Sequence, residues 1–270
     1  MNIILYIIIF TMGTLFGSFY TLAIYRIPEK IDIVKTHSFC PNCNHKLGFF
    51  ELIPIWSYIF LGGKCKNCKQ KIRPRYLILE ILSGLTFVLL ALSLKIDIYN
   101  FNIDVIIKFA FLVLYLVAIF LIAGIDKEKR HIEKSVIYYA LGILAIYIIY
   151  LCIIDNISMY RYVMYLSAII ILLIIDTILL KNKAKESYFI STLMLVIIMA
   201  IFTGEGVTIL TLIYALLVLV TDILIEKIKE KSNKNKKEHK DKNLPIGFLL
   251  GISNVIVLIM VMFINNWFIK

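Results

Sequence analysis

The sequence predicts an all-α integral membrane protein with about eight transmembrane helices and a small zinc-binding cytoplasmic insert. Of its 270 residues, 61% are hydrophobic and only 17% are charged, which is far more apolar than a soluble domain. A helix that crosses the roughly 30 Å hydrocarbon core needs about 20 apolar residues. Apolar runs of about this length occupy 3–25, 76–95, 104–124, 134–153, 159–180, 188–203, 207–225 and 245–268.

The first apolar run is expected to be a retained helix. It lacks the basic segment and the small-residue cleavage site of a signal peptide. We therefore divide the chain into a first transmembrane helix (1–25), an insert (26–75) and a transmembrane core (76–270). The core includes a Lys-rich linker at 227–243, whose composition is typical of a disordered or lipid-bound segment.

Lys and Arg are concentrated in every second connection between the apolar runs. The basic connections are 26–75, 127–134, 181–185 and 227–242, and the others carry almost no basic residues. Cytoplasmic loops are enriched in Lys and Arg, so the basic connections are expected in the cytoplasm and both termini outside. Anionic lipid accounts for the formal charge of +11, and nucleic acid is not indicated. The pattern predicts a multi-pass plasma membrane protein, of unspecified oligomeric state.

Two pairs of cysteines in the insert predict a metal site. Cys40 and Cys43 enclose Pro-Asn, and Cys65 and Cys68 enclose Lys-Asn, so each pair can present two thiolates from one turn. About fifty residues bury little apolar surface, and zinc would stabilise such an insert. Disulfides and free thiols are the alternatives, of which disulfides are rare in the reducing cytosol. His37 and His45 are also close enough in sequence to replace a ligand, whereas Cys152 is a core residue.

Four acidic residues are predicted at the cytoplasmic edges of the spans. They are Asp126, Asp176, Glu186 and Asp222. Acids at membrane borders are costly and often functional, although each one alone is also compatible with an ordinary interfacial residue paired with Lys. Two neighbouring carboxylates can act as an aspartic protease site, in which one accepts a proton from water and the other donates a proton to the scissile carbonyl.

Three sequence strings point to one family. They are Gly13-Thr-Leu-Phe-Gly17-Ser18-Phe19, Tyr25-Arg26-Ile27-Pro28 and Arg75-Tyr76-Leu-Ile-Leu-Glu80. They resemble the G-x-x-x-G-S-F, R-x-P and R-Y-P-x-x-E signatures of the type IV prepilin peptidases, with Leu77 in place of the last proline. The paired cysteines follow where that family carries its cytoplasmic zinc-binding insert. Alone, Gly13 and Gly17 are also typical of close helix packing.

The resemblance implies that Asp126 is the first catalytic aspartate. Ile132 stands where the family's I-P-D begins, but the Pro-Asp is replaced. The family's second aspartate belongs to a G-x-G-D motif, where this chain reads Lys183-Ala-Lys185-Glu186. We therefore predict Glu186 as the second acid. Asp176, Asp222 and the absence of any functional partner are the alternatives.

The resemblance further implies an aspartic endopeptidase that removes the basic leader of type IV prepilin or pseudopilin precursors at the cytoplasmic face. N-methylation with S-adenosylmethionine is an associated expectation, although the sequence contains no Gly-rich nucleotide loop. An inactive paralogue that binds pilin-like helices is the main alternative, because the G-x-G-D motif is lost. A transporter is disfavoured, because no acid lies near the middle of a span.

Overall fold

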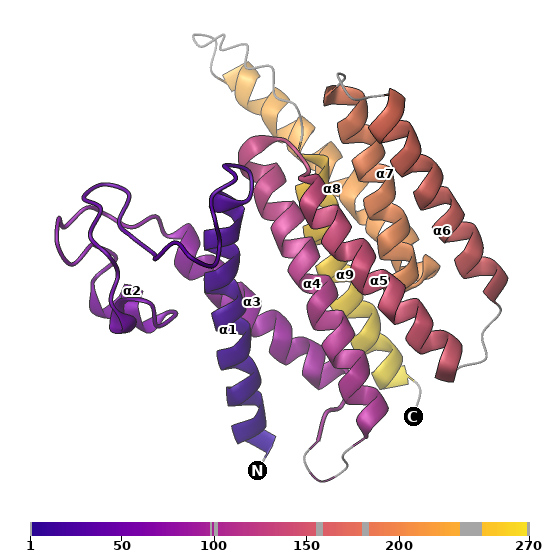
Figure 1. The fold of residues 1–270 in the computed structure, drawn as a ribbon, viewed down its shortest axis with the longest axis horizontal. Helices are drawn as coiled ribbons and strands as arrows, with labels where there is room; N and C mark the ends of the chain where they lie inside the picture. The colour runs from indigo at the N-terminus through magenta and orange to yellow at the C-terminus, as the bar shows by residue number, and fades with distance from the viewer. Residues whose placement is uncertain are drawn as a thin grey trace. The chain divides into compact units, whose positions relative to one another are not determined.

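The computed structural model describes residues 2–97, 99, 102–154, 159–179, 184–232 and 245–268. Their secondary structure is helical, with two isolated β-bridges in the insert. The elements are α1 (Asn2–Arg26), η1 (Phe49–Glu51), α2 (Trp56–Phe60), α3 (Arg75–Ser93), α4 (Ile103–Lys129), α5 (Lys134–Ile154), α6 (Met159–Ile174), the π-helical turn η2 (Ile175–Leu179), α7 (Ala184–Thr203), α8 (Glu205–Ser232) and α9 (Ile246–Phe268) (Figure 1).

The membrane character of the chain agrees with the sequence analysis. Among the described residues, seven helices are long and apolar enough to cross a bilayer, and Ser187–Thr203 is a shorter apolar helix. These eight segments correspond to the eight expected apolar runs. Helix α8 continues to Ser232 and so includes the start of the expected linker, whereas 233–244 lie outside the described residues. The chain forms two compact units, residues 1–113 and residues 114–270.

In the first unit, α1 and α3 pack closely through small residues. A Cβ atom added to Gly13 would lie 2.7 Å from Cα of Gly84, and one added to Gly17 would lie 2.6 Å from Cα of Glu80. Any side chain at these two positions would push the helices apart, which is the close-packing role of small residues in membrane helices. The two glycines are therefore needed for this contact, as their spacing also suggests.

The insert is fastened to this helix pair by two buried side chains. Arg26, only 4% exposed, donates hydrogen bonds to the carbonyl oxygens of residues 32, 33, 36 and 37 at 2.7–3.4 Å. Glu80, 8% exposed on α3, accepts a 2.7 Å hydrogen bond from the backbone N–H of Ile55. Ile55 has φ +64°, a strained value for a β-branched residue, and it directly precedes α2.

The second unit is held by buried polar and aromatic contacts in its core. The Tyr115 hydroxyl on α4 donates a 2.7 Å hydrogen bond to Oδ1 of Asn254 on α9. The Asn254 amide then donates to Oγ1 of Thr211 on α8 at 3.2 Å. Phe202 of α7 stacks between Tyr115 and Tyr147, with ring centroids 4.8 and 5.0 Å away. These satisfied contacts fix the helices that carry the acidic residues.

Candidate metal centre and candidate active site

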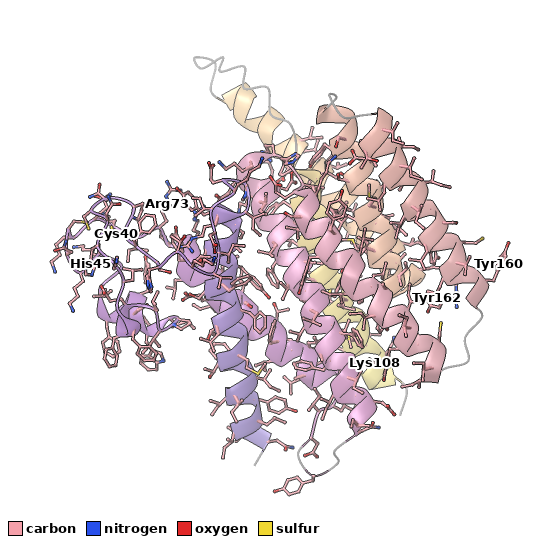
Figure 2. The ribbon with its side chains drawn as sticks, viewed as in Figure 1. Cys40, His45, Arg73, Lys108, Tyr160 and Tyr162 are labelled. Atoms are coloured by element: carbon pink, nitrogen blue, oxygen red, sulfur yellow. The ribbon has the colours of Figure 1, made fainter. Side chains whose placement is uncertain are left out.

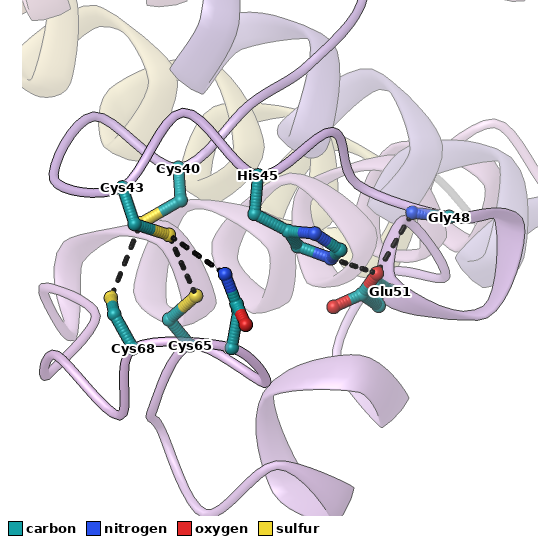
Figure 3. Close-up of polar contacts among 8 residues, drawn as sticks. Cys40, Cys43, His45, Gly48, Glu51, Cys65 and Cys68 are labelled. Carbon is teal, nitrogen blue, oxygen red and sulfur yellow. Dashed lines mark hydrogen bonds and ion pairs between the residues drawn. The ribbon is translucent and has the colours of Figure 1, made fainter.

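The four cysteines of the insert come together as predicted. Their Sγ atoms all lie within 4.8 Å of one another, with 3.8 Å between Cys40 and Cys68 and 3.9 Å between Cys43 and Cys65 (Figure 3). Tetrahedral zinc with Zn–S bonds of about 2.3 Å requires sulfur atoms about 3.8 Å apart. A disulfide would instead bring two sulfur atoms to about 2.05 Å. The arrangement is therefore able to hold one metal ion.

The two cysteine pairs sit on matching turns. The N–H of Cys40 donates to the carbonyl of His45, and the N–H of Cys65 donates to the carbonyl of Gln70, both at 2.9 Å. Each turn then passes through a residue with positive φ, Asn44 at +55° or Lys69 at +59°. An isolated β-bridge closes each turn, Phe39 to Lys46 and Lys64 to Lys71. The turns thus present their thiols in the same way from two directions.

Amide groups support the thiols from outside the cluster. Asn42 donates to Sγ of Cys68 at 3.6 Å, and Asn67 donates to Sγ of Cys43 at 3.8 Å. The hydrogen bond from Asn42 is the largest cause that lowers the pKa of the Cys68 thiol to about 6. A lower pKa favours the thiolate, which is the form that binds metal.

His45 is not part of this cluster, although the sequence allowed it as a replacement ligand. Its Nε2 lies 3.2 Å from Oε2 of Glu51, and the same oxygen accepts a 2.9 Å hydrogen bond from the N–H of Gly48 (Figure 3). The hydrogen bond from Gly48 is the main cause that lowers the pKa of Glu51. Figure 2 places Cys40, His45 and Arg73 in the insert. His45 therefore connects the first cysteine turn to η1. Among the described residues, the cluster consists of the four cysteines.

Asp126 lies in the last turn of α4, at the helix end that the charge pattern predicts to be cytoplasmic. It is completely buried, with 0% exposure. Its Oδ2 accepts a 3.1 Å hydrogen bond from the Tyr188 hydroxyl of α7 and a 3.0 Å hydrogen bond from the Phe248 N–H of α9. Its Oδ1 is buried and has no hydrogen-bond partner among the described residues. A buried unsatisfied carboxylate oxygen is costly, and such groups are typical of reactive sites.

Tyr188 connects this carboxylate to the first turn of α9. Its hydroxyl oxygen accepts hydrogen bonds from the N–H groups of Ile246 at 2.9 Å and Gly247 at 3.4 Å. These N–H groups have no partner inside the helix, and the positive end of the helix dipole favours the nearby negative charge of Asp126. Asp126 is thus held from two helices other than its own.

Gly247 makes this close approach possible. A Cβ atom at position 247 would lie 3.2 Å from Oδ2 of Asp126 and 3.3 Å from Cδ1 of Ile132. One turn later, a Cβ atom at Gly251 would lie 3.0 Å from Cβ of Ala123. The Gly-x-x-x-Gly spacing of α9 therefore seats it against α4, as small residues do in membrane bundles.

Asp176 forms a second buried acidic position near the same helix ends. It lies on the π-helical turn η2, is 2% exposed, and has its Oδ2 2.5 Å from Nζ of Lys134 at the start of α5. Its Oδ1 accepts a 2.5 Å hydrogen bond from the hydroxyl of Ser187. Ser187 directly precedes Tyr188, so adjacent residues of α7 contact the two buried aspartates. Both oxygens of Asp176 are therefore engaged.

The other two predicted acids, Glu186 and Asp222, have no described contact with Asp126. The side chain of Glu186 lies outside the described residues, although its backbone belongs to the first turn of α7. Asp222 is exposed on α8. The sequence also contains Gly204-Glu205-Gly206, which would be a second possible counterpart of the G-x-G-D motif; Glu205 follows the 20-residue α7 and accepts a hydrogen bond from Tyr165. It is separated from Tyr188 by most of a helix of about 30 Å, so this string is far from Asp126.

Several contacts of the site were not predicted from the sequence. The sequence does not mark Tyr188, Ser187 or the N-terminus of α9 as parts of the site, because a hydroxyl in an apolar run is usually a core residue. The one available signal was the pair Gly247 and Gly251 after Pro245, which is typical of a helix start with a small-residue packing face.

The comparisons with known proteins agree with the sequence resemblance over the first unit. Residues 11–94 match the family model for the bacterial peptidase A24 N-terminal domain. The predicted relationship to the prepilin peptidases is thereby confirmed for these residues. Asp126 and Tyr188 lie beyond the matched residues.

Curated relatives also match part of the chain. A protein of Vibrio cholerae named prepilin leader peptidase/N-methyltransferase is 39% identical over 85 residues, covering 28% of this chain and 34% of the relative. Proteins of the same name from Bacillus subtilis and Myxococcus xanthus are 41% and 38% identical, each over 30% of this chain, covering 32% and 24% of the relative. The chain spans about a third or less of the length of these curated relatives. No solved structure matches the chain.

Proposed function

We propose that this membrane protein is an aspartic endopeptidase that removes the leader of type IV prepilin-like precursors at the cytoplasmic face. The observation that supports this most is Asp126. It is a fully buried carboxylate at a helix end, fixed through Oδ2 by Tyr188 and by the N-terminus of α9, with Oδ1 left without a partner among the described residues.

In the proposed mechanism, the two oxygens of Asp126 have different tasks. The hydrogen bonds to Oδ2 hold the carboxylate in one orientation, so little reorganisation is needed when a substrate binds. Oδ1 is the oxygen that takes a proton from the attacking water. The second acid donates a proton to the scissile carbonyl oxygen while the water oxygen attacks the carbonyl carbon. The tetrahedral intermediate then collapses: the second acid takes back a hydroxyl proton, the C–N bond breaks, and the leaving amine receives the proton that Asp126 took from water.

We propose Glu186 as that second acid. Its position at the start of α7, two residues before Tyr188, brings its backbone to the helix end that contacts Asp126. Asp176 is the first alternative, because its buried carboxylate contacts Ser187. Its ion pair with Lys134 favours a structural role in joining the ends of α5, η2 and α7. Asp222 is the second alternative.

The metal that we propose for the cysteine cluster is zinc, which would be a structural ion for the insert. The sulfur–sulfur separations of 3.8 and 3.9 Å fit tetrahedral thiolate coordination. When bound, zinc would fasten the two cysteine turns together, and Arg26 and Glu80 would connect the folded insert to α1 and α3. Methyl transfer from S-adenosylmethionine is part of the proposal only through the names of the relatives, and no residues are assigned to it.

The proposed orientation and partners follow from the charge pattern and the relatives. Two of the basic connections, the cysteine insert itself (26–75) and the segment directly after Asp126 (127–134), are expected in the cytoplasm. The substrates would be membrane-inserted prepilin or pseudopilin precursors, whose apolar helices reach the site through the lipid. The lipids themselves would be the other partners of the chain.

A non-catalytic scaffold that binds pilin-like helices is the second candidate function. Two observations favour it: both oxygens of Asp176 are engaged, and Lys183-Ala-Lys185-Glu186 stands where the related family has G-x-G-D. Incubation of the chain, reconstituted in lipid vesicles, with a prepilin-like precursor separates the two functions. Shortening of the precursor at its leader junction supports the peptidase. Binding without shortening supports the scaffold.

A further inference from the structure

Unusually exposed aromatic side chains lie on the two short helices of the insert. Phe49, Phe50 and Phe60 are 78–80% exposed, and Trp56 and Ile59 are 60% and 58% exposed. We call these five residues the aromatic face. Trp56 stacks on Phe60 with ring centroids 5.8 Å apart, and α2 packs against η1, which carries the two other rings. An exposed apolar patch of this kind marks an interaction surface.

The depth of the aromatic face along the membrane helices can be traced through Glu80. This residue faces Gly17 across the contact between α1 and α3. Gly17 precedes Arg26, the last residue of α1, by nine positions, so Glu80 lies about 13 Å inside that helix end. On its own helix, Glu80 lies about 7 Å beyond Arg75, the first residue of α3.

The hydrogen bond from Ile55 to Glu80 therefore fixes the start of α2 beside two membrane helices, inside the ends of both. Ile55 keeps its strained φ of +64° in this position, and Trp56 follows it directly. A segment held at this depth beside lipid-crossing helices meets the boundary between headgroups and acyl chains. Trp and other aromatic side chains are enriched at that boundary.

The charge around the aromatic face also favours a lipid surface as its partner. The insert contains ten Lys and Arg residues and three acidic residues, a net charge of +7. The residues after α2 include a set of exposed cations, namely Lys64, Lys66, Lys69, Lys71 and Arg73. Basic residues beside a membrane surface are attracted to anionic headgroups.

We infer that the aromatic face inserts into the headgroup region of the bilayer that α1 and α3 cross, and anchors the insert to anionic lipid. The partner is the phospholipid surface itself. The anchor is independent of the catalytic proposal, because it uses none of the acidic residues of the second unit. It holds the cysteine cluster at a fixed height above the membrane.

Fluorescence of Trp56 in the full-length chain tests this anchor. Trp56 and Trp267 are the two tryptophans of the sequence, so Trp267→Phe leaves Trp56 as the reporter with the aromatic face intact. The protein is placed in nanodiscs of anionic phospholipid with bromine atoms near the headgroup end of the acyl chains. We expect the bromolipid to remove most of the emission, with little quenching by acrylamide in the water. Full acrylamide quenching with no effect of the bromolipid would overturn the inference.

A matched reporter on another part of the insert shows whether the contact is specific. Val34 is 90% exposed on the loop that Arg26 holds, so Val34→Trp in a Trp56→Phe, Trp267→Phe chain places the only tryptophan there. This reporter should remain open to acrylamide and be quenched much less by bromolipid. Equal quenching at both positions would contradict a specific aromatic anchor. Protection of Trp56 that arises only when a pilin-like helical peptide is added would also overturn the lipid anchor, in favour of a peptide surface.

Discussion

The Tyr188 hydroxyl donates a 3.1 Å hydrogen bond to Oδ2 of Asp126 and accepts a 2.9 Å hydrogen bond from the N–H of Ile246. A single oxygen atom thus joins three helices at the candidate active site. The proposed role of Asp126 depends on this fixed orientation, because a catalytic carboxylate must be held to within a fraction of an ångström.

Replacement of Tyr188 by Phe removes this junction and leaves the ring in place. A hydrogen bond to a charged group contributes about 2 kcal/mol, so the rate of leader removal should fall by a factor of about 30. The rate is measured with a reconstituted precursor. Tyr165→Phe is the matched control, because Tyr165 donates its hydroxyl hydrogen bond to Glu205 instead. Equal losses in the two variants would speak against a role for Tyr188 in positioning Asp126.

Gly247→Ala tests the close approach of α9 to Asp126. The added methyl group would lie 3.2 Å from Oδ2 of Asp126, so the carboxylate must shift by a few tenths of an ångström. We expect about a tenfold loss of cleavage rate, since small displacements at a reacting group are costly. Gly142→Ala is the control, because a Cβ atom there meets no atom within 4 Å. The account predicts unchanged cleavage for that variant, with helix stability higher by about 1 kcal/mol.

The identity of the second acid is tested by Glu186→Gln. The two acids act as one unit, so this variant should lose cleavage as completely as Asp126→Asn, and the double variant should be no worse. Glu186→Asp, which approaches the aspartate of the related family, should keep or raise the rate. Normal cleavage by Glu186→Gln, together with an inactive Asp176→Asn or Asp222→Asn, would show that the inactive variant has lost the second catalytic acid.

Asp176 needs its own control, because its loss leaves Lys134 without its buried partner. The Lys134 side chain is 40% exposed, so water partly solvates its charge after Asp176→Asn and the loss of stability should be about 1 kcal/mol. Lys134→Gln disturbs the same ion pair, keeps all the acids and leaves the buried Asp176 carboxylate without its cation. If the role of Asp176 is structural, Asp176→Asn should therefore lower the thermal stability and the cleavage rate no more than Lys134→Gln does. A much larger loss of cleavage in Asp176→Asn would assign that carboxylate to the chemistry.

Zinc should be bound at one ion per chain. Elemental analysis of protein purified without chelator measures the content, which Cys40→Ser or Cys65→Ser should lower. The insert should then be cleaved faster by added protease, because zinc contributes folding free energy directly. Cys152→Ser, in helix α5 and outside the cluster, should leave both readouts unchanged. Protein that contains no metal would count against the site.

The parts of the fold that the sequence predicted are those with strong local signals. The apolar runs correspond to helices, because twenty apolar residues in lipid leave a helix as the natural way to satisfy the backbone. Two C-x-x-C pairs form one cluster, since each motif encodes its own turn. The close approach of Gly13 and Gly17 to α3 likewise follows from their spacing.

The surroundings of Asp126 were harder to predict, because they depend on contacts between segments far apart in the sequence. Tyr188 and Phe248 are 62 and 122 residues from Asp126. Nothing in the local sequence marks an ordinary Tyr or a backbone N–H as a partner of this acid. The same holds for Asp176 and Lys134. In the sequence they are two separate charged residues near the ends of predicted spans, and only the folded helix ends bring them into contact.

Cleavage of a reconstituted prepilin-like precursor by Asp126→Asn tests the central claim most directly. Asn has nearly the same shape, and its side-chain oxygen can still accept the hydrogen bonds from Tyr188 and Phe248, but it cannot take a proton from water. Asp104→Asn, an exposed acid in the first turn of α4, at the other end of the helix that carries Asp126, is the control. The account predicts a shortened precursor with the unmodified chain and with Asp104→Asn, and a loss on the order of 10⁴-fold with Asp126→Asn despite normal expression and membrane insertion. Near-normal cleavage by Asp126→Asn would contradict the account.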